Sequence, residues 1–194
     1  MSGMATNITL CAVPVFFATS EGQTQRIAER FASILRSEGI ASAACDVSTL
    51  DDAAIDWTRV RGAIVGASIH LGKHQPAAHA FVSAHASRLN RLPSVFFSVS
   101  MAAASKNPGE PGKAQEIANA FPAAHGWRPQ AVISLAGRLA YSQYNFVIRF
   151  VMKRIARKEG GPTDTSRDYE FTDWTRVEQL AKDFAQTLRV SAAA

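Results

Sequence analysis

One stretch, residues 13–24, decides the fold; it reads Val13-Pro-Val-Phe-Phe-Ala-Thr-Ser-Glu-Gly-Gln-Thr24. Its apolar first half predicts a buried strand that begins near Pro14, which cannot donate to a sheet ladder. A helical pattern follows at once, so the hydroxyl-rich turn between them opens onto a helix N-terminus with unpaired N–H groups and a positive dipole end. Such an N-terminus suits a phosphate, held here by neutral donors because the turn contains no Lys or Arg. The expected phosphate-binding residues are Thr19, Ser20, Glu21, Gly22, Gln23 and Thr24.

Four further segments have strand character, namely residues 40–47, 62–68, 93–99 and 131–136, and helical patterns separate them or follow them. Alternating strands and helices predict an α/β fold with a doubly wound parallel sheet of five strands in the order 2-1-3-4-5. Ligands of such sheets bind at the carboxyl ends of the strands, beside the switch point. The loops expected there add Ser68, Ile69, His70, Leu71, Gly72, Ser98, Val99, Ser100, Met101, Gly137 and Arg138 as candidate binding residues.

The composition indicates one globular domain. The chain has 194 residues, 47% of them hydrophobic and 19% charged, which suffices for one well-filled core. Residues 1–13 are expected to form an N-terminal extension, 14–190 the domain and 191–194 a tail. No apolar run of about 18 residues predicts a transmembrane helix, and we see no signal peptide. Cys11 and Cys45 lack disulfide or metal spacing, so we expect buried reduced thiols in a cytoplasmic protein.

Several chemistries lack their motifs. The segment from Gly66 to Lys73 has one residue too many between its glycines for a P-loop, and no G-x-G-x-x-G fingerprint occurs. The histidines have no cysteines or clustered carboxylates nearby, so we expect no metal site and place His79 and His85 on a helix surface. His70 differs, because the loop after the third strand would bring it to the ligand. It is a candidate general base by position alone.

The basic character of the chain is concentrated in one segment. The net charge is +5, and residues 141–161 hold five Lys or Arg against Glu159 alone, so the remainder sums to about +1. An inserted amphipathic helix is predicted there after the fifth strand. Its expected apolar stripe is Tyr144, Val147, Ile148, Val151, Met152 and Ile155, and Arg149, Lys153 and Arg157 mark the opposite side.

Phe146 and Phe150 fall on the basic side of this predicted helix. Aromatic residues among cations fit a helix that lies at a membrane interface, or a site for a large anionic ring compound. The alternative is that the apolar stripe packs on its own domain and the phenylalanines cover a neighbouring loop. Nucleic acid is not expected as a partner, since no recognition motif accompanies the confined basic region.

Several motifs together point to a family. They are Ser20-Glu-Gly-Gln-Thr24, Gly66-Ala-Ser-Ile69, Arg88-Leu-Asn90, Trp127-Arg-Pro129, Gly160-Gly161, Thr163-Asp-Thr165 and Thr172-Asp-Trp174. From about Pro14 to Phe184 the chain resembles the bacterial menaquinone-dependent protoporphyrinogen IX dehydrogenases. The resemblance implies a flavodoxin-like fold, non-covalent FMN, and oxidation of protoporphyrinogen IX to protoporphyrin IX in haem biosynthesis, with electrons passing to a membrane quinone. It also implies an insertion after the fifth strand, matching residues 141–172.

The resemblance further implies that residues 19–24 hold the FMN phosphate, while residues 68–72 and 98–101 hold the ribityl chain and the ring. Leu71 departs from the family pattern, since many relatives have an aromatic residue there; stacking would then be weaker, or come from His70 or the insertion. The basic insertion would face the substrate propionates or the inner face of the cell membrane, with menaquinone or ubiquinone as acceptor. The oligomeric state, including a homo-oligomer, stays open.

Two alternatives remain from the residues alone. A flavodoxin-type electron carrier would bind FMN without a substrate of its own, but such carriers are usually acidic and this chain carries +5. An NAD(P)H:quinone reductase is the other, although no dinucleotide fingerprint favours it.

Overall fold

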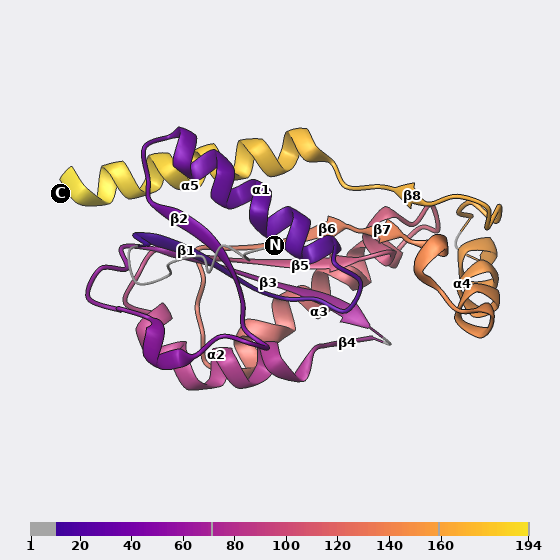
Figure 1. Ribbon diagram of the computed structural model, residues 1–194, viewed down its shortest axis with the longest axis horizontal. Helices are drawn as coiled ribbons and strands as arrows, with labels where there is room; N and C mark the ends of the chain where they lie inside the picture. Colours follow the sequence, from indigo (N-terminus) through magenta and orange to yellow (C-terminus); the bar gives the residue numbers. More distant parts are fainter. Residues whose placement is uncertain (1–10, 71, 159, 194) are drawn as a thin grey trace, which may run out of the picture.

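The computed structural model describes residues 11–70, 72–158 and 160–193. Its centre is a sheet of five parallel strands in the order β2-β1-β3-β5-β6, which confirms the predicted doubly wound, flavodoxin-like arrangement (Figure 1). The strand bounds are β1 Val13–Ala18, β2 Ser42–Asp46, β3 Ala63–His70, β5 Ser94–Ser100 and β6 Ala131–Ala136. A two-residue strand, β4 (Lys73–His74), adds antiparallel to the end of β3 and was not predicted, because two residues carry no periodicity.

Helices cover both faces of the sheet (Figure 1). The side chains of Val15 and Phe17 pack with α1 and α5 on one face, whereas Phe16 packs with α2 and α3 on the other. This division follows from the alternation of side chains along a strand. The helix bounds are α1 Gln23–Ser37, α2 Pro76–Leu89, α3 Glu110–Ala124 and α5 Trp174–Ala193, and short 3-10 turns lie at η2 Asp52–Ala54 and η3 Ala102–Ala104.

Pro14 is compatible with a central strand because of its place in the register. β1 pairs with β2 from Val13 onward, but its pairing with β3 starts only at Val15, opposite Ile64. The proline therefore stands ahead of the β3 ladder and removes no hydrogen bond from it.

An insertion projects beyond the carboxyl ends of the strands (Figure 1). It contains β7 (Arg138–Leu139), η4 (Tyr141–Gln143), α4 (Phe146–Lys158) and β8 (Tyr169–Glu170), and β7 pairs antiparallel with β8. A small core of its own includes Leu139, Ala140, Tyr141, Tyr144 and Ala156. The predicted inserted helix is thus present, and the β7–β8 ladder holds its two ends together.

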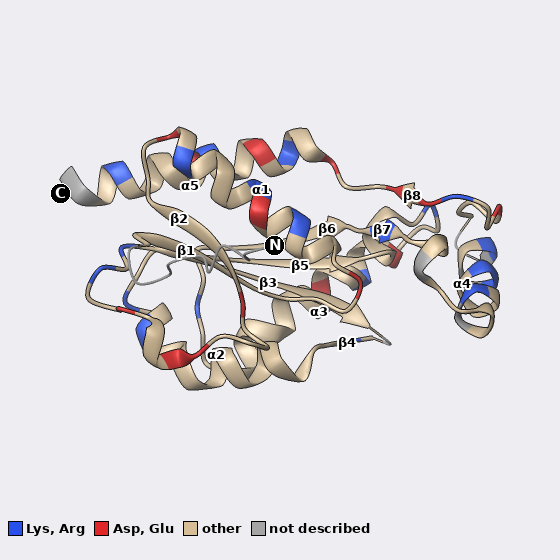
Figure 2. Cartoon of the chain, in the orientation of Figure 1, with Lys and Arg blue, Asp and Glu red and all other residues tan. Residues whose placement is uncertain are grey.

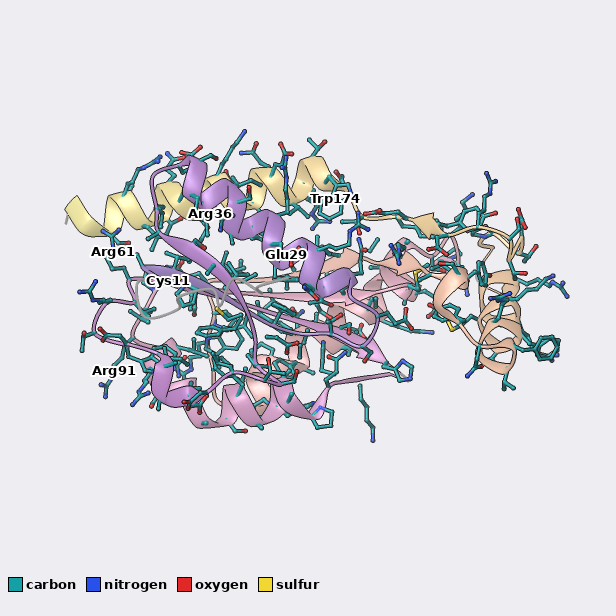
Figure 3. All side chains as sticks on the ribbon, viewed as in Figure 1. Cys11, Glu29, Arg36, Arg61, Arg91 and Trp174 are labelled. Carbon is teal, nitrogen blue, oxygen red and sulfur yellow. The ribbon has the colours of Figure 1, made fainter. Side chains whose placement is uncertain are left out.

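The last helix returns along α1. Trp174 opens α5 beside α1, where the guanidinium of Arg26 lies 5.5 Å from the centroid of its ring (Figure 3). α5 runs on to Ala193, so the predicted tail is helical over residues 191–193. Cys11 and Cys45 are buried, as predicted, and they are not joined in a disulfide; burial raises the pKa of Cys45 to about 12. None of the helices in the described part of the chain combines the length and hydropathy that crossing a bilayer requires.

Candidate functional site

The carboxyl ends of the strands surround a cavity of about 380 Å³, called here the strand-end cavity. This volume lies within the range of about 300–1,000 Å³ typical of small-molecule sites. Four loops line it, as expected from the sheet order. The predicted residues among its lining are Thr19, Ser20, Glu21, Gln23, Thr24, Ser68, Ile69, His70, Gly72, Val99, Ser100, Met101, Gly137 and Arg138.

Two other predicted residues support these loops from outside the lining. Gly22 takes the left-handed conformation at φ 81°, and its N–H donates to Thr19 Oγ1 at 3.0 Å. Ser98 is fully buried within β5, where its Oγ lies 2.9 Å from His74 Nε2. Leu71, also predicted, lies outside the described residues. Residues of α3 and α4 that line the cavity were not predicted: Glu110, Ala114, Ile117 and Met152.

The start of α1 offers unpaired donors to the strand-end cavity. No side chain caps this helix, and its first turn contains no acidic residue. The first backbone bond runs from Arg26 N–H to Gly22 C=O, so the N–H groups before Arg26 have no partner within the helix. Thr24 is fully buried, and its Oγ1 has no hydrogen-bond partner among the described residues. A neutral set of donors therefore faces the place where an anion is expected.

Gln75 connects two of the cavity loops and was missed from sequence. Its amide donates to Ser20 Oγ at 3.2 Å and also to Ser68 Oγ, while its buried Oε1 has no partner in the described structure. In the sequence it is only a polar residue before Pro76, the first residue of α2. No local signal distinguishes it, because its partners belong to the loops after β1 and β3.

The insertion is tied to the same loop. The hydroxyl of Tyr144 donates to Glu21 Oε2 at 2.7 Å, and the amide of Gln23 donates to Thr172 Oγ1 at 2.8 Å and to Glu170 Oε1 at 3.0 Å. Burial raises the pKa of Tyr144 well above its ordinary value, and the hydrogen bond to Glu21 raises it further. Tyr144 therefore remains a donor at physiological pH, and the insertion is anchored to the loop that opens α1.

The chain is similar to known proteins over most of its length. A model of the flavodoxin domain matches residues 14–166. A protoporphyrinogen IX dehydrogenase (quinone) of Escherichia coli strain K12 is 34% identical over 171 residues, which cover 88% of this chain and 93% of that protein. A protein of the same name from Leishmania major is 33% identical over 175 residues, with 88% and 73% covered.

The chain belongs to the quinone-dependent protoporphyrinogen IX dehydrogenase family. Solved structures agree on its fold. An archaeal flavodoxin superposes with a TM-score of 0.55 at 13% identity, with 91% of this chain and 98% of that one covered. The rubredoxin oxygen:oxidoreductase of Desulfovibrio gigas has a TM-score of 0.59 at 13% identity, covering 94% of this chain and 37% of the other.

In this family member the histidines occupy distinct environments. His70 is exposed at the end of β3 and lines the strand-end cavity. His74 is buried, and this burial, with a smaller effect of His79, lowers its pKa to about 4. His85, predicted on a helix surface, is instead buried beside Trp57 with its Nε2 3.1 Å from Asp52. Within the described residues, no group of three or more His, Cys, Asp and Glu side chains could hold a metal ion.

The apolar stripe predicted for α4 is exposed in part. Phe146 and Phe150 are 84% and 62% exposed, and Val147 and Val151, which belong to the stripe, are exposed at 68% and 47%. The alternative in which the whole stripe packs on its own domain is therefore wrong. Among the described side chains of α4, Met152 and Ala156 pack into the small core of the insertion.

The cationic side chains of α4 differ in their exposure to solvent. Arg149, predicted on the outer side, is half-buried and donates to the C=O of Tyr144 at 3.1 Å, so it stabilises the turn before the helix. Lys153 is also half-buried, whereas Arg154 and Arg157 are exposed. Figure 2 shows the basic residues gathered on this helix at the far end of the molecule. The four exposed apolar residues and these two arginines form what is called here the α4 surface.

Proposed function

We propose that this chain binds FMN in the strand-end cavity and oxidises protoporphyrinogen IX, with a quinone as electron acceptor. The observation that carries the proposal is the unpaired donor set at the start of α1, in a family whose named members are quinone-dependent protoporphyrinogen IX dehydrogenases. The same family membership favours this function over an electron carrier or an NAD(P)H:quinone reductase.

The loop from Thr19 to Thr24 fits a phosphate ester. It offers the free N–H groups of the first turn of α1, the dipole of that helix, and the unpartnered Thr24 hydroxyl. A buried hydroxyl without a partner is costly, so a ligand that accepts a hydrogen bond from it would explain this atom. The carboxylate of Glu21 accepts from Tyr144, which leaves the amides and hydroxyls of the loop to meet the anion.

The remaining lining fits the sugar-like chain and the ring of FMN. Ser68 and Ser100 supply hydroxyls, and Ile69, Val99 and Met101 supply apolar contact. When bound there, FMN would supply the two-electron redox chemistry, and the protein would bind it, orient it and exclude water. Further polar contact is available from Arg138, whose buried Nε has no hydrogen-bond partner among the described residues.

The oxidation of protoporphyrinogen IX releases protons as well as electrons, in three successive two-electron steps. We assign the uptake of a proton to His70, because it lines the strand-end cavity and is exposed at the end of β3. An exposed imidazole can pass the proton on to water after each step. The role of His70 as general base rests on this position.

The α4 surface fits contact with an anionic membrane. Two phenylalanines and two valines form its apolar part, while Arg154 and Arg157 continue the same face toward the helix C-terminus. An interfacial helix buries such apolar side chains below the headgroups and leaves its cations among them. Docking of this kind would hold a cytoplasmic protein at the inner face of the cell membrane, where menaquinone or ubiquinone resides.

Membrane docking is tested with Phe150→Ser and with Val190→Ser as its matched control. Val190 is 65% exposed on α5, away from the α4 surface. We expect Phe150→Ser to weaken sedimentation with vesicles of mixed phosphatidylglycerol and phosphatidylcholine by about tenfold, given the roughly 1.5–3 kcal/mol that burying such a side chain contributes. Val190→Ser should leave sedimentation unchanged. Equal binding of both variants would contradict the assignment of this surface.

The enzymatic proposal is tested on purified protein loaded with FMN under anaerobic conditions. Protoporphyrinogen IX and menadione are added together, and the fluorescence of protoporphyrin IX is followed against samples lacking either the quinone or the protein. We expect porphyrin to form only in the complete mixture. In a parallel mixture NADPH replaces protoporphyrinogen IX as the electron donor. Oxidation of NADPH by menadione in that mixture, without porphyrin formation in the first one, would instead establish a quinone reductase, and a protein that oxidises neither donor would be an electron carrier.

A further inference from the structure

A second cavity, of about 220 Å³, lies between η3, the start of α3 and the insertion, and is called here the insertion cavity. It shares Met101, Ala102, Glu110 and Met152 with the strand-end cavity. Because the same side chains line both spaces, a single layer of residues separates them. A molecule held in the insertion cavity would therefore lie next to one held in the strand-end cavity.

The walls of the insertion cavity are mostly apolar. Leu139, Ala156 and Phe171 form the side made by the insertion, while Ser105 and Lys106 bring polar groups to its edge. Among the described residues, none accepts a hydrogen bond or forms an ion pair with the Lys106 ammonium. An apolar chamber with a cationic donor at its edge suits a flat ring that carries carbonyl oxygens.

The size of the insertion cavity limits what can enter. A cavity of about 150 Å³ accommodates benzene, and drug-sized molecules need about 300 Å³ or more. At about 220 Å³ the insertion cavity has room for one or two fused rings and is too small for the four pyrrole rings of a porphyrinogen.

We propose that the insertion cavity binds the ring of the quinone and does not receive the porphyrinogen. This rests on the proposed function, which supplies the electrons. In each cycle the quinone gains two electrons and two protons, which the porphyrinogen yields when it is oxidised, and it leaves as the hydroquinone. The Lys106 ammonium would donate to one quinone carbonyl.

The position of α4 explains how a membrane quinone reaches this chamber. Met152 and Ala156 line the cavity from one face of α4, and Phe150 and Val151 are exposed on another. The bilayer and the cavity would then be separated by the width of one helix, about 10 Å. Gly160 and Gly161 complete the wall, and a Cβ at Gly161 would lie 3.3 Å from the carbonyl oxygen of Ala156, so a larger residue there would crowd the backbone of α4.

The test fills the insertion cavity without touching the strand-end cavity. Ala104 lines only the insertion cavity, and Ala104→Phe would place a ring inside it. Its neighbour Ala103 lines neither cavity and is also half-buried, so Ala103→Phe is the matched control. Lys106→Met removes the polar contact at an exposed position, where misfolding is not expected.

Equilibrium dialysis of menadione against the oxidised, FMN-loaded protein measures binding without turnover. We expect Ala104→Phe to weaken menadione binding about tenfold or more through overpacking. Lys106→Met should weaken it about threefold to tenfold through the loss of one hydrogen bond. Ala103→Phe should bind like the unmodified protein. Reduction of the bound FMN by protoporphyrinogen IX, and its reoxidation by ferricyanide, should be unchanged in all three variants.

Unchanged menadione binding in Ala104→Phe and Lys106→Met would overturn the proposal. The proposal would also be overturned if a variant that retains its FMN lost porphyrinogen oxidation and menadione binding together, because that result is expected when the two compounds share one site. Failure of the proposed function itself looks different, because the unmodified protein would then form no porphyrin at all.

Discussion

The sharpest prediction concerns Thr24→Val, which removes the unpartnered hydroxyl at the start of α1 and keeps the shape of the side chain. In the flavin-free protein this hydroxyl is fully buried and has no partner among the described residues. An unsatisfied buried polar group costs about 1–3 kcal/mol. The variant should therefore be more stable without flavin, by about 1 kcal/mol, which corresponds to a rise in Tm of about 2–4 °C for a chain of this size.

FMN binding should change in the opposite direction. A hydrogen bond to a charged acceptor such as phosphate contributes about 1.5–3 kcal/mol, so Thr24→Val should weaken FMN binding roughly tenfold to a hundredfold. Riboflavin, which lacks the phosphate, should bind with unchanged affinity. The gain in stability and the loss in affinity both come from Thr24 Oγ1. This hydroxyl has no hydrogen-bond partner among the described residues of the flavin-free protein, and it would donate to the phosphate when FMN is bound.

Two measurements check this: urea unfolding of the flavin-free protein, and titration of flavin fluorescence with FMN and with riboflavin. Thr19→Val is the control, because Thr19 Oγ1 accepts from the N–H of Gly22 at 3.0 Å. That variant should lose about 1 kcal/mol of stability instead of gaining it. If Thr24→Val is destabilised in the same way, or binds FMN and riboflavin with equally reduced affinity, the phosphate assignment of this loop is refuted.

Two further predictions concern stability. Burial lowers the pKa of His74 to about 4, whereas the imidazole of the unfolded chain has the ordinary value of about 6.5. Between these two pH values only the unfolded chain gains the proton, so the free energy of unfolding should fall by about 3 kcal/mol as the pH drops from about 6.5 to 4. His74→Gln keeps a partner for Ser98 and does not titrate, so its free energy of unfolding in urea should fall less between pH 7 and pH 4.5; an equal fall in both proteins would contradict this assignment. Gly66→Ala should destabilise the protein by about 1–3 kcal/mol or more, because the new Cβ would lie 2.0 Å from Cζ of Phe97 in the core. Gly112→Ala, whose Cβ meets nothing within 4 Å in α3, should be neutral or stabilising by up to about 1 kcal/mol, and equal thermal shifts in the two variants would refute the clash.

The sequence predicted the sheet and the cavity loops through local signals. Apolar runs of strand length alternate with helical patterns, and this alternation requires a parallel sheet whose carboxyl ends meet at one edge. For that reason the loop from Thr19 to Thr24 and the loop from Ser68 to Gly72 could be brought to one site without coordinates. Ser98 belongs to the same loop set, yet it lies two residues before Ser100 in β5, where its hydroxyl meets His74 instead of the cavity.

Contacts between segments far apart in the chain could not be predicted from local sequence patterns. The bond from Tyr144 to Glu21 spans 123 residues, and the one from Gln23 to Thr172 spans 149. Both depend on where the insertion folds back, which no local pattern contains. The same holds for Gln75, whose partners lie on two other loops.

The sequence by itself determined the order of strands and helices, the hydroxyl-rich turn that opens α1 and the basic amphipathic character of α4. Only the tertiary structure decided which face of α4 is covered, since a helical pattern separates two faces but does not say which one meets the domain. Val147 and Val151 are exposed, whereas Met152 and Ala156 pack into the core of the insertion. The insertion cavity also depends on the tertiary structure, because its walls come from η3, the start of α3 and the insertion, which are separate segments of the chain.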